Sequence, residues 1–194
     1  MARKEGHQSN YFIAIVPPSP VYEQAQNLKL HFRDNYQSKA SLNSPPHITL
    51  HMPFRWKEKK EDDLINTLSD FTADFSSFSI CLKNFSCFSP KVIFIDIETS
   101  PRLNELQTQL HKFCKRELNI FNADYKEQPF YPHITLAFRD LKKPAFHKAW
   151  EEFKDKDFRA DFLVEQITLL KHTGKVWQIF KEFVLMQVPF DVSR

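Results

Sequence analysis

The pentapeptide Pro-His-Ile-Thr-Leu occurs twice in this chain of 194 residues, with its histidine at His47 in the first half and at His133 in the second. Composition does not explain the repeat, because the chain has only 2 glycines and no low-complexity tract. In an extended strand, residues two positions apart point to the same face. Each copy therefore predicts a strand with histidine and threonine on one face and buried isoleucine and leucine on the other.

The order of the predicted elements is duplicated as well. Hydrophobic periodicity predicts strand, helix, motif strand, helix and strand over residues 11–88, and the same order over residues 91–172. A final strand follows at 176–188. The expected strands are 11–16, 47–54, 78–88, 92–98, 131–138, 162–171 and 176–188, and the expected helices are 21–36, 57–75, 101–118 and 144–154.

This duplication predicts an α+β fold with two similar lobes, which form a single bilobal domain over residues 1–194. We expect a pseudo-two-fold arrangement with one sheet and flanking helices in each lobe. The two motif strands then face each other across a central cleft. Ser100 and Pro101 give one helix a serine N-cap followed by proline at the first helical position, which is a preferred helix start.

Composition narrows the class of protein. With 42% hydrophobic residues and 20 phenylalanines, the chain can bury a substantial core, which excludes a disordered or fibrous protein. The net charge of +3 permits a phosphate or nucleic acid partner without requiring one. Three cysteines without a Cys-x-x-Cys pair indicate reduced thiols and a cytoplasmic location, and no apolar run is long enough to cross a membrane.

Two histidines on opposite sides of a phosphorus atom form an acid–base pair. Histidine exchanges protons near neutral pH, so one imidazole can deprotonate an attacking water while the other protonates the leaving oxygen. A threonine hydroxyl on the same face can donate a hydrogen bond to a phosphate oxygen in the transition state. This chemistry needs no metal or cofactor. A single His-x-Thr sequence is most often structural, but two copies in equivalent positions favour a functional pair.

These twin motifs resemble those of the two-histidine phosphoesterase superfamily, which includes bacterial RNA 2′,3′-cyclic phosphodiesterases known as 2′-5′ RNA ligases. The resemblance extends over most of the chain, from the strand at 11–16 to the final hairpin. It implies a bilobal fold and metal-independent hydrolysis of cyclic or linear phosphodiesters on nucleotides or RNA ends. It also implies that His47 and His133 are the acid–base residues, and that Thr49 and Thr135 donate hydrogen bonds to the phosphate.

The resemblance becomes asymmetric beyond the motifs. Many members carry a basic residue soon after the second motif; here Arg139 follows, and strand parity places it on the His133 face. No arginine follows the first motif before Arg55. Phosphate binding need not be symmetric, and the substrate need not be RNA.

Other residues are weaker candidates. Tyr131 and Phe54 could stack on a base, although packing at a rim or in the core is at least an equal alternative. Lys171 lies beside the final hairpin and could contact phosphate, although a solvated turn is the favoured interpretation. His51 shares the face of His47 by parity, but strand positions four apart are about 13 Å apart, which is too far for one metal ion to bridge. Four further histidines are interpreted as surface residues: His7, His31, His111 and His147.

The leading hypothesis is a phosphodiesterase that hydrolyses 2′,3′-cyclic phosphates, or related phosphodiesters, of nucleotides or RNA ends. The alternative is a binding module that holds a nucleotide or RNA end in the same cleft without turnover. A purely structural role would require the two histidines to be buried and hydrogen-bonded to the core, and a structure in which they lie more than about 10 Å apart or face away from each other would favour it. Symmetry assigns neither histidine as the acid, and the loops at 38–46 and 119–130 are expected to set specificity.

Overall fold

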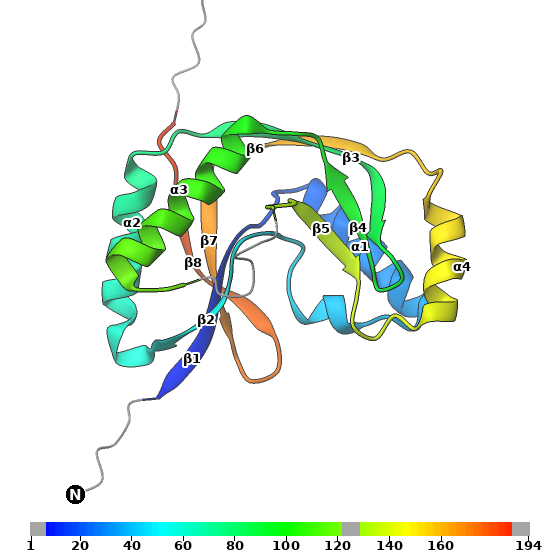
Figure 1. Ribbon diagram of the computed structural model, residues 1–194, viewed down its shortest axis with the longest axis horizontal. Helices are drawn as coiled ribbons and strands as arrows, with labels where there is room; N and C mark the ends of the chain where they lie inside the picture. Colours follow the sequence, from blue (N-terminus) through cyan, green and yellow to red (C-terminus); the bar gives the residue numbers. More distant parts are fainter. Residues whose placement is uncertain (1–6, 122–128, 188–194) are drawn as a thin grey trace, which may run out of the picture.

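The computed structural model describes residues 7–121 and 129–187 of the chain. Within these residues, eight strands form one curled antiparallel sheet in the order β6-β3-β4-β5-β2-β1-β7-β8 (Figure 1). The strands are β1 (Gln8–Ile15), β2 (Ile48–Lys57), β3 (Phe78–Phe88), β4 (Val92–Ile97), β5 (His133–Ala137), β6 (Arg159–Val164), β7 (Gln166–His172) and β8 (Trp177–Val184). The α-helices are α1 (Val21–Tyr36), α2 (Glu61–Ala73), α3 (Pro101–Leu118) and α4 (Lys143–Phe153).

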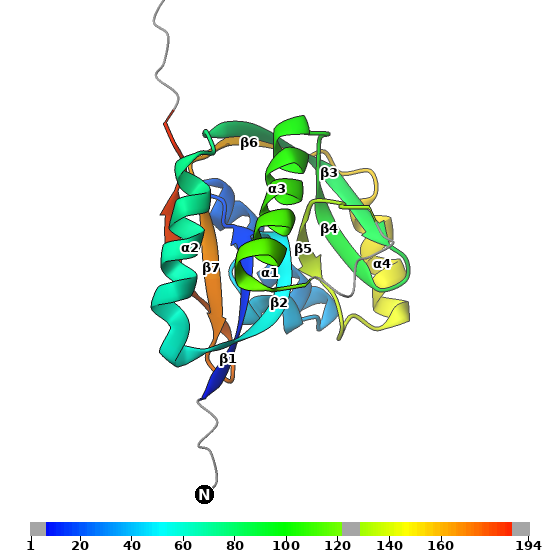
Figure 2. The ribbon, with the colours of Figure 1, turned by 60° about the vertical axis from the view of Figure 1, so that its left-hand side comes forward.

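The sheet has two halves that meet at a seam between β2 and β5. Outward from the seam, the strand order is β2-β1-β7-β8 on one side and β5-β4-β3-β6 on the other. The β2 lobe consists of the first four strands with α2 and α3, and the β5 lobe consists of the other four with α1 and α4 (Figure 1, Figure 2). One residue pair, Ile48 with Ile134, joins the two lobes across the seam. The structure therefore has the predicted duplicated α+β fold, with the sheets of the two lobes joined at their edges into one.

The chain passes between the lobes more often than the order of elements suggests. For example, α1 follows β1 of the β2 lobe but packs against β5, and β3 follows α2 but pairs with β4. The single strand predicted at 162–171 is wrong for the same reason: Glu165 separates β6, which pairs with β3, from β7, which pairs with β1. Periodicity reports burial and carries no information on which strand is the neighbour. The predicted final strand is β8, which ends at Val184, and position 188 lies outside the described residues.

Local signals set several helix boundaries correctly. α3 begins at Pro101, and the side-chain oxygen of its N-cap Ser100 accepts a hydrogen bond from the Leu103 N–H at 3.3 Å. α1 covers the whole predicted span because its buried residues recur every three or four positions. Of the four α-helices in the described ranges, none is both long and apolar enough to cross a membrane.

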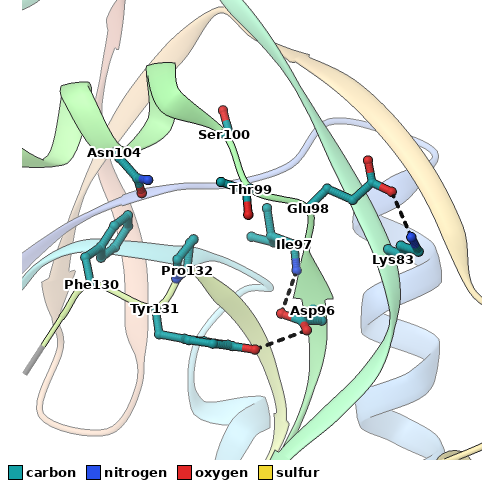
Figure 3. A pocket seen from close by; sticks show the side chains of 10 residues that line it. All are labelled: Lys83, Asp96, Ile97, Glu98, Thr99, Ser100, Asn104, Phe130, Tyr131 and Pro132. Carbon is teal, nitrogen blue, oxygen red and sulfur yellow. Dashed lines mark hydrogen bonds and ion pairs between the residues drawn. The ribbon is translucent and has the colours of Figure 1, made fainter.

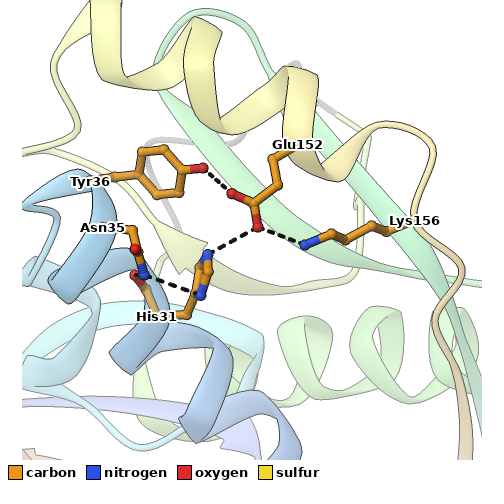
Figure 4. Close-up of polar contacts among 5 residues, drawn as sticks. All are labelled: His31, Asn35, Tyr36, Glu152 and Lys156. Carbon is orange, nitrogen blue, oxygen red and sulfur yellow. Dashed lines mark hydrogen bonds and ion pairs between the residues drawn. The ribbon is translucent and has the colours of Figure 1, made fainter.

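A polar network ties α1 to α4 (Figure 4). The carboxylate of Glu152 on α4 accepts a hydrogen bond from the Tyr36 hydroxyl, and it lies 3.1 Å from Nε2 of His31 and 2.6 Å from Nζ of Lys156. His31 is thus an interhelical contact at the surface, with 35% of its side chain exposed. The network anchors α1, which carries a buried lysine, Lys29, toward the motif loop described below.

Candidate active site

The two motifs meet at the seam between β2 and β5. His47 directly precedes β2, and His133 is the first residue of β5. Ile48 and Ile134 are fully buried, whereas both motif histidines are partly exposed, as strand alternation predicts. We call the side of the sheet that carries the motif histidines the motif face. The helices cover the opposite face.

The antiparallel register brings the four motif side chains into one cluster. When the register of the pair at the seam is continued by one residue in each direction, His47 lies opposite Thr135 and Thr49 lies opposite His133. Opposed residues of an antiparallel pair have Cβ atoms about 5 Å apart, and diagonal neighbours are about 7–8 Å apart. Each histidine therefore faces the threonine of the other motif, and the diagonal spacing suits one phosphate group between the two rings.

Each imidazole is oriented by a backbone carbonyl two residues earlier. Nδ1 of His47 lies 2.8 Å from the Pro45 carbonyl oxygen, and Nδ1 of His133 lies 2.7 Å from that of Tyr131. A carbonyl only accepts hydrogen bonds, so Nδ1 must be the protonated nitrogen in both rings. Nε2 of each ring is then available to accept a proton, or to donate one when the ring is charged.

An aromatic ring packs against each imidazole in the same way. The ring of Phe12 on β1 lies 4.8 Å from the His47 ring at an interplanar angle of 49°. The ring of Phe94 on β4 lies 4.6 Å from the His133 ring at 44°. Both phenylalanines are buried, and they restrict the rotation of the histidines that they contact. The duplicated fold thus supplies two matched, rigidly held imidazoles.

Burial makes both imidazoles weak bases. It lowers the pKa of His47 to about 4, and the positive charges of Lys29 and His133 add to this effect. Burial also lowers the pKa of His133, whereas the Tyr131 carbonyl and the negative charge of Asp96 act to raise it. Because of these opposite neighbours, protonation is electrostatically favoured at His133 relative to His47.

Sequence reasoning missed both of these charged neighbours. Lys29 occupies a buried position of the apolar stripe of α1, and its Nζ donates a hydrogen bond to the Ser44 carbonyl at 2.7 Å. Asp96 on β4 is the cross-strand partner of His133, and it accepts a hydrogen bond from the Tyr131 hydroxyl at 3.1 Å. The available signal for Lys29 was a lysine at a position where helical periodicity requires an apolar residue. Asp96 gave no such signal, because its role depends on strand register.

A bulge in β2 shows that strand parity does not apply to His51. Ala14 pairs with Thr49, but the preceding residue, Ile13, pairs with His51, so Leu50 is an extra residue in β2. An extra residue reverses the faces beyond it. His51 is therefore on the helix-covered face, only 1% exposed, and the expectation that it shares the face of His47 is wrong.

The buried His51 ring lies 5.0 Å from the ring of His111 on α3. His111 is therefore also wrongly interpreted as a surface residue. Burial lowers the pKa of His51 to about 4 and lowers the pKa of His111 as well. This pair belongs to the packing between β2 and α3, away from the motif face.

The same bulge occurs in the second motif strand and affects Arg139. Phe94 pairs with Thr135 and Ile93 with Ala137, so the faces reverse at the leucine between them. β5 ends at Ala137, and Arg139 has a left-handed backbone with φ of 57°. Strand parity therefore does not place Arg139 on the His133 face. Its side chain is exposed, with the guanidinium 5.0 Å from the centre of the ring of the preceding residue.

The structure also corrects the expectations for Phe54 and Lys171. Phe54 is buried on the helix-covered face, where its ring stacks on Tyr11 at 6.1 Å. Lys171 is the cross-strand partner of Tyr11, and its Nζ pairs with Glu58 and Glu61 at 2.7 Å each. Both side chains therefore lie away from the motif face, Phe54 in the core and Lys171 in an ion-pair network. The position of Lys171 beside the hairpin and the aromatic character of Phe54 could not predict these placements, because the pairing between strands decides which face of the sheet a side chain lies on.

Tyr131 is the predicted aromatic contact that lies near a motif histidine. Its side chain is 47% exposed, and its ring lies 6.4 Å from the His133 ring. It borders a cavity of about 620 Å³ beside the motif cluster (Figure 3). The cavity is lined by Lys83, Asp96, Ile97, Glu98, Thr99, Ser100, Asn104, Phe130, Tyr131 and Pro132. Of the loops expected to set specificity, 38–46 contains the 3₁₀ helix Ala40–Asn43, whereas 122–128 lies outside the described residues.

In residues 7–121 and 129–187, no group of three or more histidine, cysteine, aspartate or glutamate side chains is arranged to hold a metal ion. All three cysteines, Cys81, Cys87 and Cys114, are free thiols.

Known proteins share both the sequence pattern and the fold. The pattern of the 2′-5′ RNA ligase superfamily matches residues 17–176. A protein of Geobacillus kaustophilus that carries the name of a phosphoesterase is 29% identical over 178 residues, covering 90% of this chain and 95% of its own. E. coli LigT, solved in complex with 3′-AMP, superimposes with a TM-score of 0.68 at 21% identity, covering 93% of this chain and 100% of LigT. TT0787 of Thermus thermophilus gives a TM-score of 0.65 at 21% identity, with 91% and 97% of the two chains covered.

Proposed function

This chain belongs to the 2′-5′ RNA ligase superfamily, and on that premise we propose that it is a phosphodiesterase that opens 2′,3′-cyclic phosphates of nucleotides or RNA ends. A phosphoesterase function follows from the family, and the cyclic substrate is the step beyond it. One observation carries the proposal. The two motif imidazoles have Nδ1 held by carbonyls, so Nε2 is the nitrogen of each ring that can exchange a proton, and the isoleucines of the two motifs pair across the seam, which brings the motifs side by side.

The proposed reaction begins with His47 as the general base. Its neutral Nε2 removes a proton from a water molecule, and the water oxygen forms a bond to phosphorus. The bond from phosphorus to one ribose oxygen breaks, and that oxygen takes the Nε2 proton of His133. The product is a ribose phosphate monoester with a free neighbouring hydroxyl, and the two histidines have exchanged protonation states. Solvent exchange restores them.

The assignment of base and acid rests on the charges around the two rings. Lys29 disfavours a positive imidazolium at His47, whereas Asp96 favours one at His133. A bound phosphodiester adds negative charge beside both rings, which raises both pKa values from their low values in the free protein. Because the negative charge of Asp96 adds to this effect at His133, the rise in pKa favours protonation of His133 over His47.

The remaining residues of the site would stabilise the phosphate and the nucleoside. In this proposal, Thr49 and Thr135 donate hydrogen bonds to non-bridging oxygens as charge accumulates on them in the transition state. Tyr131, beside the cavity, is our candidate for contact with a base or ribose. Arg139 remains a candidate for a phosphate contact because it is exposed soon after the second motif, although strand parity does not support its placement. The binding of 3′-AMP, ATP and NADP⁺ by LigT supports a nucleotide as the partner.

The test is hydrolysis of 2′,3′-cyclic nucleotides by wild-type protein and by His47→Ala and His133→Ala, with EDTA present. We expect each substitution to lower kcat/KM by about 10²-fold or more, the usual contribution of a general acid or base. Wild-type activity in either variant, or a strict requirement for added metal, would contradict the mechanism. If wild-type protein binds the nucleotide but forms no product, the protein is a binding module instead.

A further inference from the structure

Lys29 is a buried cation that the fold does not require. Its side chain is only 1% exposed, and it forms no ion pair with a carboxylate among the residues that the structure describes. Burying an ammonium group without a counter-charge is unfavourable, and the cost appears here as a pKa lowered to about 7 by desolvation. An apolar side chain at this position would avoid that cost.

The equivalent helix in the second repeat buries no charged side chain. α3 occupies the place of α1 in the second copy of the element order, and its buried residues are all apolar: Leu103, Leu106, Leu110, Cys114 and Leu118. The buried residues of α1 include Lys29 among apolar neighbours. A helix can therefore pack on the sheet without a buried lysine, so packing alone does not explain Lys29.

Lys29 contacts the segment that orients His47. Its Nζ donates a hydrogen bond to the Ser44 carbonyl at 2.7 Å, and the next carbonyl, that of Pro45, accepts the Nδ1 hydrogen bond of His47 at 2.8 Å. Pro45 and Pro46 restrict the backbone between these points, because proline fixes its own φ and limits the residue before it. Holding the Ser44 carbonyl therefore holds the acceptor that sets the direction of the His47 ring.

The charge of Lys29 also acts on His47 directly. The titratable groups that act on the His47 ring are Lys29 from α1 and His133 from β5, whereas β1 presents the apolar ring of Phe12 to it. Both charged neighbours oppose a proton on His47. A neutral His47 is the form that can act as a base.

We propose that Lys29 is a positioning residue for His47, which fixes the direction of the ring through the Ser44–Pro46 segment and opposes a positive charge on the imidazole. The inference deepens the proposed function and rests on it for the role of His47. On this proposal the two motif histidines have opposite charged neighbours. His47 has the buried ammonium group of Lys29, and His133 has the carboxylate of Asp96.

Two substitutions separate the two effects of Lys29. Lys29→Met removes the charge and the hydrogen bond at similar volume, whereas Lys29→Gln removes the charge and keeps a donor for the Ser44 carbonyl. Lys148→Met is the matched control, because Lys148 is exposed on α4 and lies outside the loops expected to set specificity. The first measurement is the pKa of the His47 imidazole by NMR titration between pH 3 and 6, where Lys29 is largely protonated in the wild type. The second is kcat on a 2′,3′-cyclic nucleotide at pH 7, and the third is Tm.

We expect both Lys29 variants to raise the pKa of His47 by about one pH unit. We expect kcat to fall about 10-fold in Lys29→Met and less in Lys29→Gln, because the glutamine amide still holds the segment. Tm of Lys29→Met should not fall, because removal of the buried charge offsets the lost hydrogen bond. Lys148→Met should leave all three values unchanged.

An unchanged His47 pKa in both variants, or a loss of kcat accompanied by an equal loss of folded protein, would overturn the proposal. Failure of the wild type to hydrolyse any phosphodiester would contradict the proposed function alone. In that case the NMR titration still decides whether Lys29 controls the protonation of His47, because it needs no turnover.

Discussion

The two halves of the site share their geometry and differ in their charges. In each half, a carbonyl two residues before the histidine holds Nδ1, a buried phenylalanine packs on the ring, and a bulge follows the motif threonine. Behind His47 lies the ammonium of Lys29, and beside His133 lies the carboxylate of Asp96. Duplication therefore accounts for two matched imidazoles, and single residues that differ between the two repeats account for the opposite charges beside them. An acid–base pair needs two opposed imidazoles and also a difference in charge that favours a proton on one of them.

The largest expected effect distinguishes the general acid, His133, from the general base, His47. In thymidine 3′-(4-nitrophenyl phosphate), the leaving 4-nitrophenolate is far more stable than a ribose alkoxide and does not need a proton from an acid. We expect His133→Ala to recover about 10²-fold of its lost activity on this substrate relative to a cyclic nucleotide, whereas His47→Ala recovers little. The measurement is kcat/KM for both variants and both substrates. The opposite pattern would exchange the two roles, and equal recovery would show that the halves do not divide the labour.

The next comparison concerns the position four residues after each motif histidine, which is His51 in one half and Ala137 in the other. The folded pKa of His51, about 4, lies below the value near 6.5 of an exposed histidine, so the unfolded chain takes up a proton first as pH falls. This contribution to stability is fully present above about pH 7 and is lost as pH falls toward 4.

The expected loss from His51 between pH 7 and pH 5 is about 2 kcal/mol of unfolding free energy. Urea unfolding of wild-type protein and His51→Ala at both pH values measures it. The variant should be less stable at pH 7, because a buried ring is removed, but its stability should depend less on pH by this amount. Equal pH dependence in the two proteins would show that His51 does not titrate as its burial predicts.

The smallest expected effect concerns the carboxylate of the second half. Asp96→Asn keeps an acceptor for the Tyr131 hydroxyl but removes the negative charge that raises the pKa of His133. We expect the alkaline limb of the pH profile of kcat to move to lower pH, with activity at pH 7.5 reduced about threefold. Tyr131→Phe is the control, because it removes the hydrogen bond and leaves the charge. A shift of the profile in Tyr131→Phe alone would assign the effect to orientation of the ring instead.

Most elements of the fold could be predicted from the sequence. The predicted spans of α1, β3 and α3 coincide with the observed ones, because amphipathic periodicity and a serine–proline helix start are local signals. The strand predicted at 162–171 failed where the signal is not local: the run divides at Glu165 between two lobes. The candidate site shows the same division. The histidines and threonines follow from the repeat, whereas His51, Arg139, Phe54 and Lys171 were assigned by parity or proximity along the chain.

The sequence by itself determined that two equivalent strands each present histidine and threonine on one face, because side-chain alternation within a few residues is set by backbone geometry. It also determined the duplicated α+β class through the repeated order of elements. Only the tertiary structure decided that the two motif strands meet edge to edge, that a bulge turns His51 into the core, and that Lys29 and Asp96 reach opposite halves of the site. These facts depend on register and on contacts between residues distant in the chain. No local pattern encodes them, because each arises from which surfaces the folded chain brings together.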